Sequence, residues 1–131
     1  MTRSALILAA GILGAVGIGA RAFEAHGITT LLDISQPRMT DFSSATEMIL
    51  VHAPAMLALA GIVDYVPRVA RYAGMLFTLG VVLFAGPLLH YGLSGVRSVM
   101  MLTPVGGAAL ILGWLLIAAG GALRLLRKPA L

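Results

Sequence analysis

Apolar residues fall into four long stretches along the chain, separated by short polar segments. The stretches cover about residues 5–22, 45–65, 72–92 and 103–124. Each is close to the roughly 20 residues that an α-helix needs to cross a hydrocarbon core of about 30 Å. The pattern therefore predicts an all-α integral membrane protein, a four-helix bundle that forms a single transmembrane domain over residues 1–131.

The composition excludes a soluble domain. Hydrophobic residues make up 60% of the chain and charged residues only 11%, and the mean hydropathy is +1.00. Because a soluble domain carries about 25% charged residues, too few are present here to cover a water-facing surface. The 16 glycines show no period, which excludes a collagen-like chain. The chain has no cysteine, so disulfides and thiolate metal sites are excluded as well.

The net charge of +4 indicates how the chain is threaded rather than a nucleic-acid partner. The basic residues are spread along the chain at the ends of the apolar stretches, where they act as topology signals. Lys and Arg in short loops favour the cytoplasmic side. We therefore expect both termini to lie in the cytoplasm. The cytoplasmic side would hold Arg3, Arg68, Arg71, Arg124, Arg127 and Lys128, and the other side Arg21, Arg38 and Arg97.

The predicted loops cover residues 23–44 and 93–102 outside and 66–71 inside. Within the first loop, residues 28–32 are apolar enough to lie in the membrane interface. The first stretch also resembles a secretory signal peptide, with small residues at Ala20 and Ala22 that fit a cleavage site. We expect it to be retained as the first span.

Local chemistry marks the expected helix ends. Ser44 and Glu47 fit a capping box, which predicts the start of the second span. Thr103 before Pro104 has the pattern of a capping hydroxyl followed by a proline at the first helical position, which predicts the start of the fourth span. Pro67 is expected to close the second span.

Two further prolines lie inside predicted spans. Pro54 and Pro87 should kink the second and third helices, because each removes a backbone N–H. The carbonyls of Leu50 and Leu83, four residues earlier, would then need other donors.

Small residues recur at helical spacing in the first and fourth spans. Such ridges let helices approach closely in lipid, so they predict seams within the bundle. A glycine-mediated homodimer face would use the same residues, and the sequence does not separate the two. The ridges are Gly11, Ala15 and Gly19, and Gly106, Ala109, Gly113 and Gly120.

Ionisable residues inside a membrane are a hypothesis for a functional site. The three histidines all fall toward the outer side of the predicted bundle, as does the glycine-rich start of the fourth span. We therefore predict one polar pocket there. The candidate pocket consists of His26, Glu47, His52, His90, Thr103, Gly106 and Gly107.

Each member of the candidate pocket also has a purely structural interpretation. Glu47 completes the capping box, and a neutral His52 could donate to a carbonyl freed by the proline. His90 could anchor a helix at the interface, and His26 could be a solvated cation at a helix carboxyl end. The start of the fourth span could bind an anion or a lipid headgroup, or simply pack tightly on another helix.

No metal, cofactor or catalytic residue is predicted. Imidazoles are ligands for Zn, Cu or Fe, but no two of the histidines have ligand spacing in the sequence. His52 and His90 are the one pair suited to haem. A proton-coupled exporter would need a carboxylate well inside a span, and none is found there.

Several segments in the same order resemble the small bacterial inner-membrane family called domain of unknown function 423, whose eukaryotic relatives are the transmembrane protein 256 group. They are residues 22–26, 47–52, 79–86 and 103–107, followed by Gly113 and Trp114. The resemblance covers nearly the whole chain. It implies four helices and an inner-membrane location, and it brings no reaction, substrate or cofactor.

The resemblance also bears on the histidines. His26 and His52 match the two histidines of the family, whereas Glu24 replaces a family glycine and His90 lies where relatives often carry other residues. It therefore favours a hydrogen-bonded pair of His26 and His52 beneath the start of the fourth helix over a three-histidine metal site.

We expect a non-catalytic protein, either an accessory or interaction subunit or a binder of lipid or another small hydrophobic ligand. The expected partners are membrane lipids, together with a membrane protein complex or further copies of the chain. A small transporter and a histidine-ligated metal or haem redox protein remain as alternatives.

Overall fold

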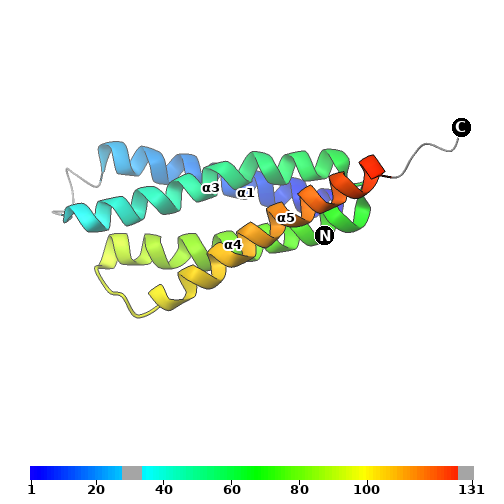
Figure 1. Ribbon diagram of the computed structural model, residues 1–131. Coiled ribbons are helices and arrows are strands. Elements are labelled where there is room, and N and C mark those ends of the chain that lie inside the picture. Colours follow the sequence, from blue (N-terminus) through cyan, green and yellow to red (C-terminus); the bar gives the residue numbers. More distant parts are fainter. Residues whose placement is uncertain (28–33, 127–131) are drawn as a thin grey trace, which may run out of the picture.

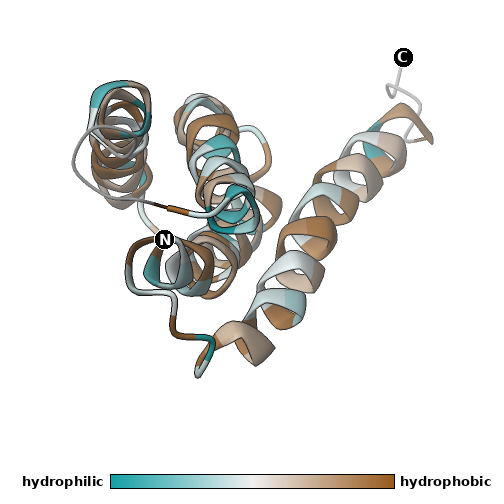
Figure 2. Cartoon of the chain, turned by 90° about the vertical axis from the view of Figure 1, so that its left-hand side faces the viewer, coloured by the Kyte–Doolittle hydropathy of each residue, from teal (hydrophilic) through white to brown (hydrophobic). Residues whose placement is uncertain are grey.

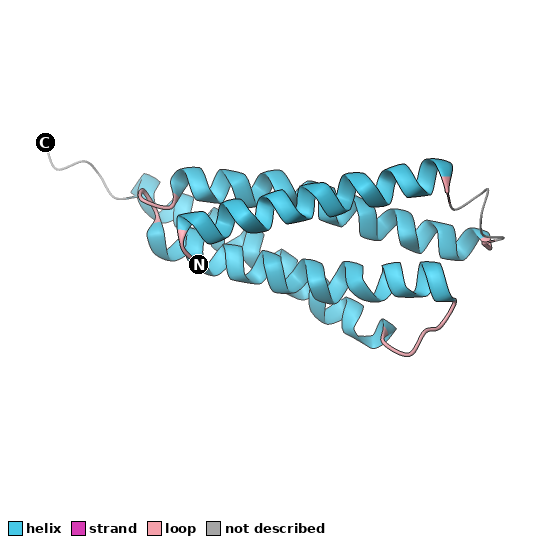
Figure 3. Ribbon diagram, turned by 180° about the vertical axis from the view of Figure 1, so that it is seen from behind, coloured by secondary structure: helices cyan, strands magenta, loops and turns pink. Residues whose placement is uncertain are grey.

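The computed structural model describes residues 1–27 and 34–126, which form helices joined by short loops (Figure 3). The predicted interface segment 28–32 lies outside the described residues, as do Arg127 and Lys128. The helices are α1 (Arg3–His26), α3 (Gln36–Ile62), α4 (Pro67–Ser94), the short 3₁₀ helix η1 (Met100–Leu102) and α5 (Thr103–Leu126).

The helices pack in the order of the chain, each against the next. α3 and α4 form the centre and hold most of the buried residues, while α1 flanks α3 and α5 flanks α4. α5 runs obliquely across α4, and seen from the end it stands to one side of the other helices (Figures 1 and 2). The prediction of four apolar helices is confirmed, since four described segments are long and apolar enough to cross a membrane.

The predicted start of the second span is wrong. α3 begins nine residues earlier, at Gln36, after Ser35 in an extended conformation and with Pro37 in its first turn. Ser44 lies inside the helix, and its hydroxyl donates to the Thr40 carbonyl at 2.9 Å, so Ser44 and Glu47 form no capping box. A helix of 27 residues is about 40 Å long and outruns the hydrocarbon core, whereas hydropathy detects only its apolar part.

Two other predicted helix ends need correction. Pro67 opens α4 instead of closing the second span, because α3 already ends at Ile62. Thr103 has helical backbone angles and follows η1 directly, so it is the first residue of α5 and not a cap before it. In both places proline lies in a first turn, where its missing N–H costs no helical hydrogen bond. Pro54 and Pro87 lie inside α3 and α4 as predicted.

The seam predicted along the fourth span is confirmed. A Cβ on Gly106 would lie 2.3 Å from the backbone nitrogen of Phe84, so only glycine allows this approach of α5 to α4. Gly113 packs in the same way on Phe77, and Gly120 packs on Val69.

The seam predicted along the first span is wrong. A Cβ on Gly11 or Gly19 would meet nothing within 4 Å, and Ala15 is exposed. α1 instead approaches α3 through Gly17, where an added Cβ would lie 2.7 Å from the Leu50 side chain. The glycine that serves the contact therefore lies on a different face from the predicted ridge.

The start of α1, the turn from α3 to α4 and the end of α5 lie at one end of the molecule (Figure 1). We call this the basic end, because four described arginines lie there against one carboxylate, Asp64. The opposite end carries both signs of charge. The four arginines are Arg3, Arg68, Arg71 and Arg124.

Candidate functional site

His52 is the histidine that the fold buries. Its side chain is 2% exposed, and it lies 16 residues into α3, about 24 Å along the helix. Nδ1 lies 2.8 Å from the Met48 carbonyl oxygen, and Nε2 lies 3.2 Å from the indole nitrogen of Trp114. Because an indole N–H only donates and a carbonyl only accepts, the imidazole is the neutral tautomer with its proton on Nδ1.

Phe77 completes an aromatic cluster around this histidine. The rings of His52 and Phe77 meet edge to face with centroids 4.9 Å apart, and the centroids of Phe77 and Trp114 are 5.0 Å apart. The three side chains come from α3, α4 and α5. The cluster therefore joins α5 to α3, two helices that otherwise meet little.

These contacts overturn two predictions about His52. Both ring nitrogens are already engaged by Met48 and Trp114, so the predicted hydrogen-bonded pair with His26 does not form. The carbonyl that accepts from the imidazole belongs to Met48, not to Leu50, whose carbonyl loses its donor at the proline. The i−4 carbonyl is simply within reach of the imidazole on the same helix face.

The other ionisable residues of the candidate pocket lie apart from His52. His26 is the exposed last residue of α1. His90 is exposed near the end of α4, where its Nε2 lies 3.4 Å from the Ser94 hydroxyl. Glu47 is exposed on α3 and lines an open surface hollow shared with Arg21. Within the described residues, no three His, Cys, Asp or Glu side chains are grouped to hold a metal ion.

The start of α5 is occupied by its contact with α4. Gly106 is buried against the α4 backbone, and Gly107 faces the Phe84 ring. The Thr103 hydroxyl is buried without a hydrogen-bond partner in the described residues. Of the two interpretations that the sequence left open here, the geometry matches the tight helix contact.

Polar groups at the opposite end pair with one another. Arg38 on α3 donates to the carbonyls of Gly92 and Leu93, at 3.1 and 2.6 Å, and so holds α3 to the end of α4. Arg97 donates to the Tyr91 hydroxyl at 2.9 Å. This hydrogen bond, with Coulombic attraction from Tyr91 and Asp41, raises the pKa of Arg97 above its usual value. These groups therefore serve the fold of the loop that follows α4.

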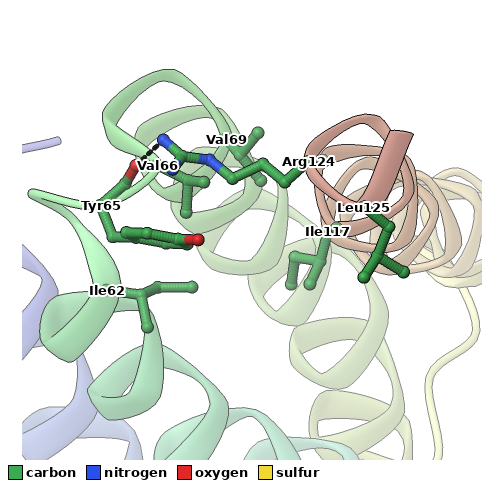
Figure 4. A pocket seen from close by; sticks show the side chains of 9 residues that line it. Ile62, Tyr65, Val66, Val69, Ile117, Arg124 and Leu125 are labelled. Atoms are coloured by element: carbon green, nitrogen blue, oxygen red, sulfur yellow. Dashed lines mark hydrogen bonds between the residues drawn. The ribbon is translucent and has the colours of Figure 1, made fainter. Parts of the chain in front are cut away.

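An apolar hollow lies at the basic end, between α3 and α5 and above the first turn of α4 (Figure 4). We call it the basic-end groove. Its volume is about 500 Å³, and its walls are mainly apolar. The lining residues are Ile62, Tyr65, Val66, Val69, Ile117, Gly120, Gly121, Arg124 and Leu125.

A single cation lies among the lining residues of the groove. Arg124 extends from the last turn of α5 toward the turn after α3, where its guanidinium donates to the Tyr65 backbone carbonyl (Figure 4). The same guanidinium lies over the Tyr65 ring, with Cζ 3.8 Å from the centroid. A cation stacked on an aromatic face is both stabilised and held in one orientation. Arg124 therefore marks a fixed positive charge at the groove.

Glycines on α5 leave room in the groove. Gly120 lets α5 approach Val69, which closes the floor, whereas a Cβ on Gly121 would meet nothing within 4 Å. Trp114, Ile117, Gly121 and Arg124 share one face of α5, since they are spaced three, four and three residues apart. That face leads from the groove to the aromatic cluster over about 15 Å.

The sequence alone does not predict this groove. In the sequence Arg124 is a topology signal, and no pattern distinguishes Tyr65 or Val69. The available signal was the pair Gly120 and Gly121 one turn before a basic residue. That signal does not predict which part of the molecule Arg124 contacts, because the contact depends on the oblique course of α5.

A protein-family model described as "Protein of unknown function (DUF423)" matches residues 13–107. Two of the similar curated proteins are UPF0382 membrane proteins of Staphylococcus saprophyticus and Staphylococcus epidermidis, 32% and 34% identical over 113 and 110 residues. These alignments cover 83% and 81% of this chain and 92% and 88% of the relatives. No solved structure matches.

Another relative is the UPF0382 inner membrane protein YgdD of Escherichia coli (strain K12). It is 33% identical over 129 residues, which is 98% of this chain and 96% of the relative. Together with the four candidate spans, this similarity supports the predicted location, a multi-pass protein of the inner membrane.

Proposed function

Since the chain belongs to the DUF423 family, the UPF0382 membrane proteins, we propose that it acts without catalysis as a lipid-binding membrane protein, with the basic-end groove as the binding site. One observation carries the proposal: an apolar groove of about 500 Å³ with a fixed arginine beside it. A lipid is a ligand of matching chemistry, an apolar chain joined to a polar head.

The position of the groove supports a lipid more than a soluble ligand. The groove lies where α3 ends and α4 begins, at the level where membrane-spanning segments meet water. Its apolar wall follows α5 toward the middle of the bundle through Ile117. An acyl chain could enter sideways from the bilayer, and the polar head would stay at the surface beside Arg124.

We place the basic end on the cytoplasmic side. Its arginines lie in the first turn of α1, the first turns of α4 and the last turn of α5, where the positive-inside rule counts them. Labelling of a cysteine introduced at Ser98, in this cysteine-free chain, reads the orientation. A membrane-impermeant maleimide should reach it from outside the cell, and labelling only from the cytoplasm would reverse the placement.

The groove can be filled without disturbing the helix contacts. Gly121 lines the groove and nothing lies within 4 Å of its Cβ position, so we expect the new side chain of Gly121→Leu to occupy groove space. Gly19→Leu is the matched control, since a Cβ there also meets nothing but lies on the exposed face of α1. Both changes place the same side chain in a helix.

Native mass spectrometry of the three proteins, released from their own membranes, is the test. We expect the unaltered chain and Gly19→Leu to retain lipid, and Gly121→Leu to lose most of it because the groove is occupied. Equal lipid retention by Gly121→Leu and Gly19→Leu would contradict the proposal.

A further inference from the structure

We propose that the lipid bound in the basic-end groove is an anionic phospholipid, whose phosphate is held by Arg124 together with Arg68. This inference rests on the proposed lipid binding and adds the chemical class of the headgroup. It follows from the charges at this end, from a second hollow beside the groove and from the fixed position of Arg124.

The balance of charge at the basic end favours an anion. Asp64 is the one carboxylate there among the described residues, and it is paired with Arg3, whose Nε also donates to the Ala60 carbonyl at 3.2 Å. Arg68 and Arg71 are exposed and make no hydrogen bond or ion pair within the described part of the chain. Positive charge is therefore left unneutralised beside the groove.

A second hollow brings Arg68 and Arg124 to one place. It has a volume of about 310 Å³ and shares Val66, Val69 and Gly120 with the groove. Arg68 from the first turn of α4 and Arg124 from the last turn of α5 both line it. A phosphate there would lie within reach of both guanidinium groups while its acyl chain occupied the groove.

The guanidinium of Arg124 is positioned to bind a phosphate. The hydrogen bond to the Tyr65 carbonyl uses only part of the five N–H donors of a guanidinium. Its planar fork matches two oxygens of a phosphate, and stacking on Tyr65 has already restricted its rotation. Arg68 beside it has no hydrogen bond or ion pair within the described residues, so its guanidinium is available to the same phosphate.

The occupant is a phospholipid rather than a free anion, because the two arginines adjoin an apolar groove that inorganic phosphate would leave empty. The cytoplasmic leaflet, where we place this end, is rich in anionic lipids. Each Lys or Arg near that surface typically strengthens the attraction about fivefold.

The only tryptophan of the chain provides the readout. Trp114 lies one turn of α5 from Ile117 in the groove wall, so a brominated acyl chain in the groove should quench its fluorescence. The probes are brominated phosphatidylglycerol and brominated phosphatidylcholine, each titrated into protein in mixed micelles. We expect half-maximal quenching at an about fivefold lower fraction of the anionic lipid.

Arg68→Gln should reduce this preference, because it removes one of the two positive charges that favour a headgroup of net negative charge over one that carries choline. Arg68 is exposed, so the change disturbs no helix contact. Arg124→Gln should reduce the preference too. Arg71→Gln is the matched control, since Arg71 is equally exposed at the same end but lines neither hollow. The control should keep the preference, and inorganic phosphate should not abolish it.

The outcomes separate this inference from the proposed lipid binding. Equal quenching by the two lipids, or a preference lost equally in Arg71→Gln and Arg68→Gln, would overturn the anionic class while lipid binding stood. Loss of the preference in inorganic phosphate at constant ionic strength would indicate a free-anion site and overturn it too. Quenching no stronger than in Gly121→Leu would overturn both.

Discussion

At the scale of single residues, Trp114 and His52 each satisfy a hydrogen-bonding group of the other that would otherwise lack a partner. An indole N–H near the middle of a membrane helix has no water to donate to, and a buried imidazole has an acceptor to satisfy. Their 3.2 Å contact satisfies both groups at once, and the Met48 carbonyl accepts a hydrogen bond from the imidazole Nδ1–H. We infer that the pair helps to hold α5 against the rest of the molecule.

The pair can be measured with a double-mutant cycle. Trp114→Phe removes the indole donor, and His52→Leu removes its acceptor. We expect each to destabilise the fold and the two to be coupled by about 0.6–2 kcal/mol, the usual range for hydrogen bonds between membrane helices. Thermal unfolding of the four proteins in detergent, followed by circular dichroism, gives the coupling. Strictly additive losses would show that the contact contributes nothing.

At the scale of elements, we expect the contact between α4 and α5 to tolerate an added methyl group at Gly107 but not at the adjacent Gly106. In Gly106→Ala the new Cβ would lie 2.3 Å from the Phe84 backbone nitrogen, so α5 must move away. In Gly107→Ala it would lie 3.6 Å from the Phe84 ring, an ordinary contact.

We therefore expect Gly106→Ala to lower the free energy of unfolding by about 1–3 kcal/mol, a typical cost of overpacking, and Gly107→Ala to change it little. Comparison of their unfolding midpoints checks this, with the unaltered protein as reference. Similar midpoints for the two variants would mean that the helices approach each other elsewhere.

The element scale also shows how far the sequence can be interpreted. The four apolar stretches predicted the four helices, because crossing a bilayer imposes a length and a composition that a single chain displays. The start of α3 was missed because Gln36 and the polar residues after it continue the helix beyond the hydrocarbon, where hydropathy no longer reports helix. The predicted α5 seam is correct, whereas the predicted α1 seam lies on the wrong face, because spacing does not reveal which face of a helix meets a neighbour.

The candidate site depended still more on tertiary structure. The sequence grouped the histidines by depth along their spans, but depth leaves open the direction in which each side chain points. His52 faces Trp114, a residue that the sequence marks only through a family resemblance. The groove depends on the oblique course of α5, which brings Arg124 to Tyr65, and no local pattern encodes that angle.

At the scale of the whole molecule, α5 packs on one long helix and is fastened to the others at two places. It packs on α4 along its length, and it reaches α3 and the turn after it through Trp114 and Arg124. The groove lies between these two attachments, so the same arrangement that fastens α5 also leaves space beside it. A ligand in that space would contact three helices at once.

The most direct test of lipid binding is a photocrosslink. A phospholipid with a diazirine near the end of one acyl chain would be incorporated into membranes that contain the protein, and the crosslinked peptides would be identified by mass spectrometry. We predict that crosslinks concentrate on Ile62, Val69, Ile117 and Gly121, and that Gly121→Leu removes them. Crosslinks spread evenly over lipid-facing residues, with Leu8 and Ile12 of α1 labelled as strongly as the groove, would contradict the account.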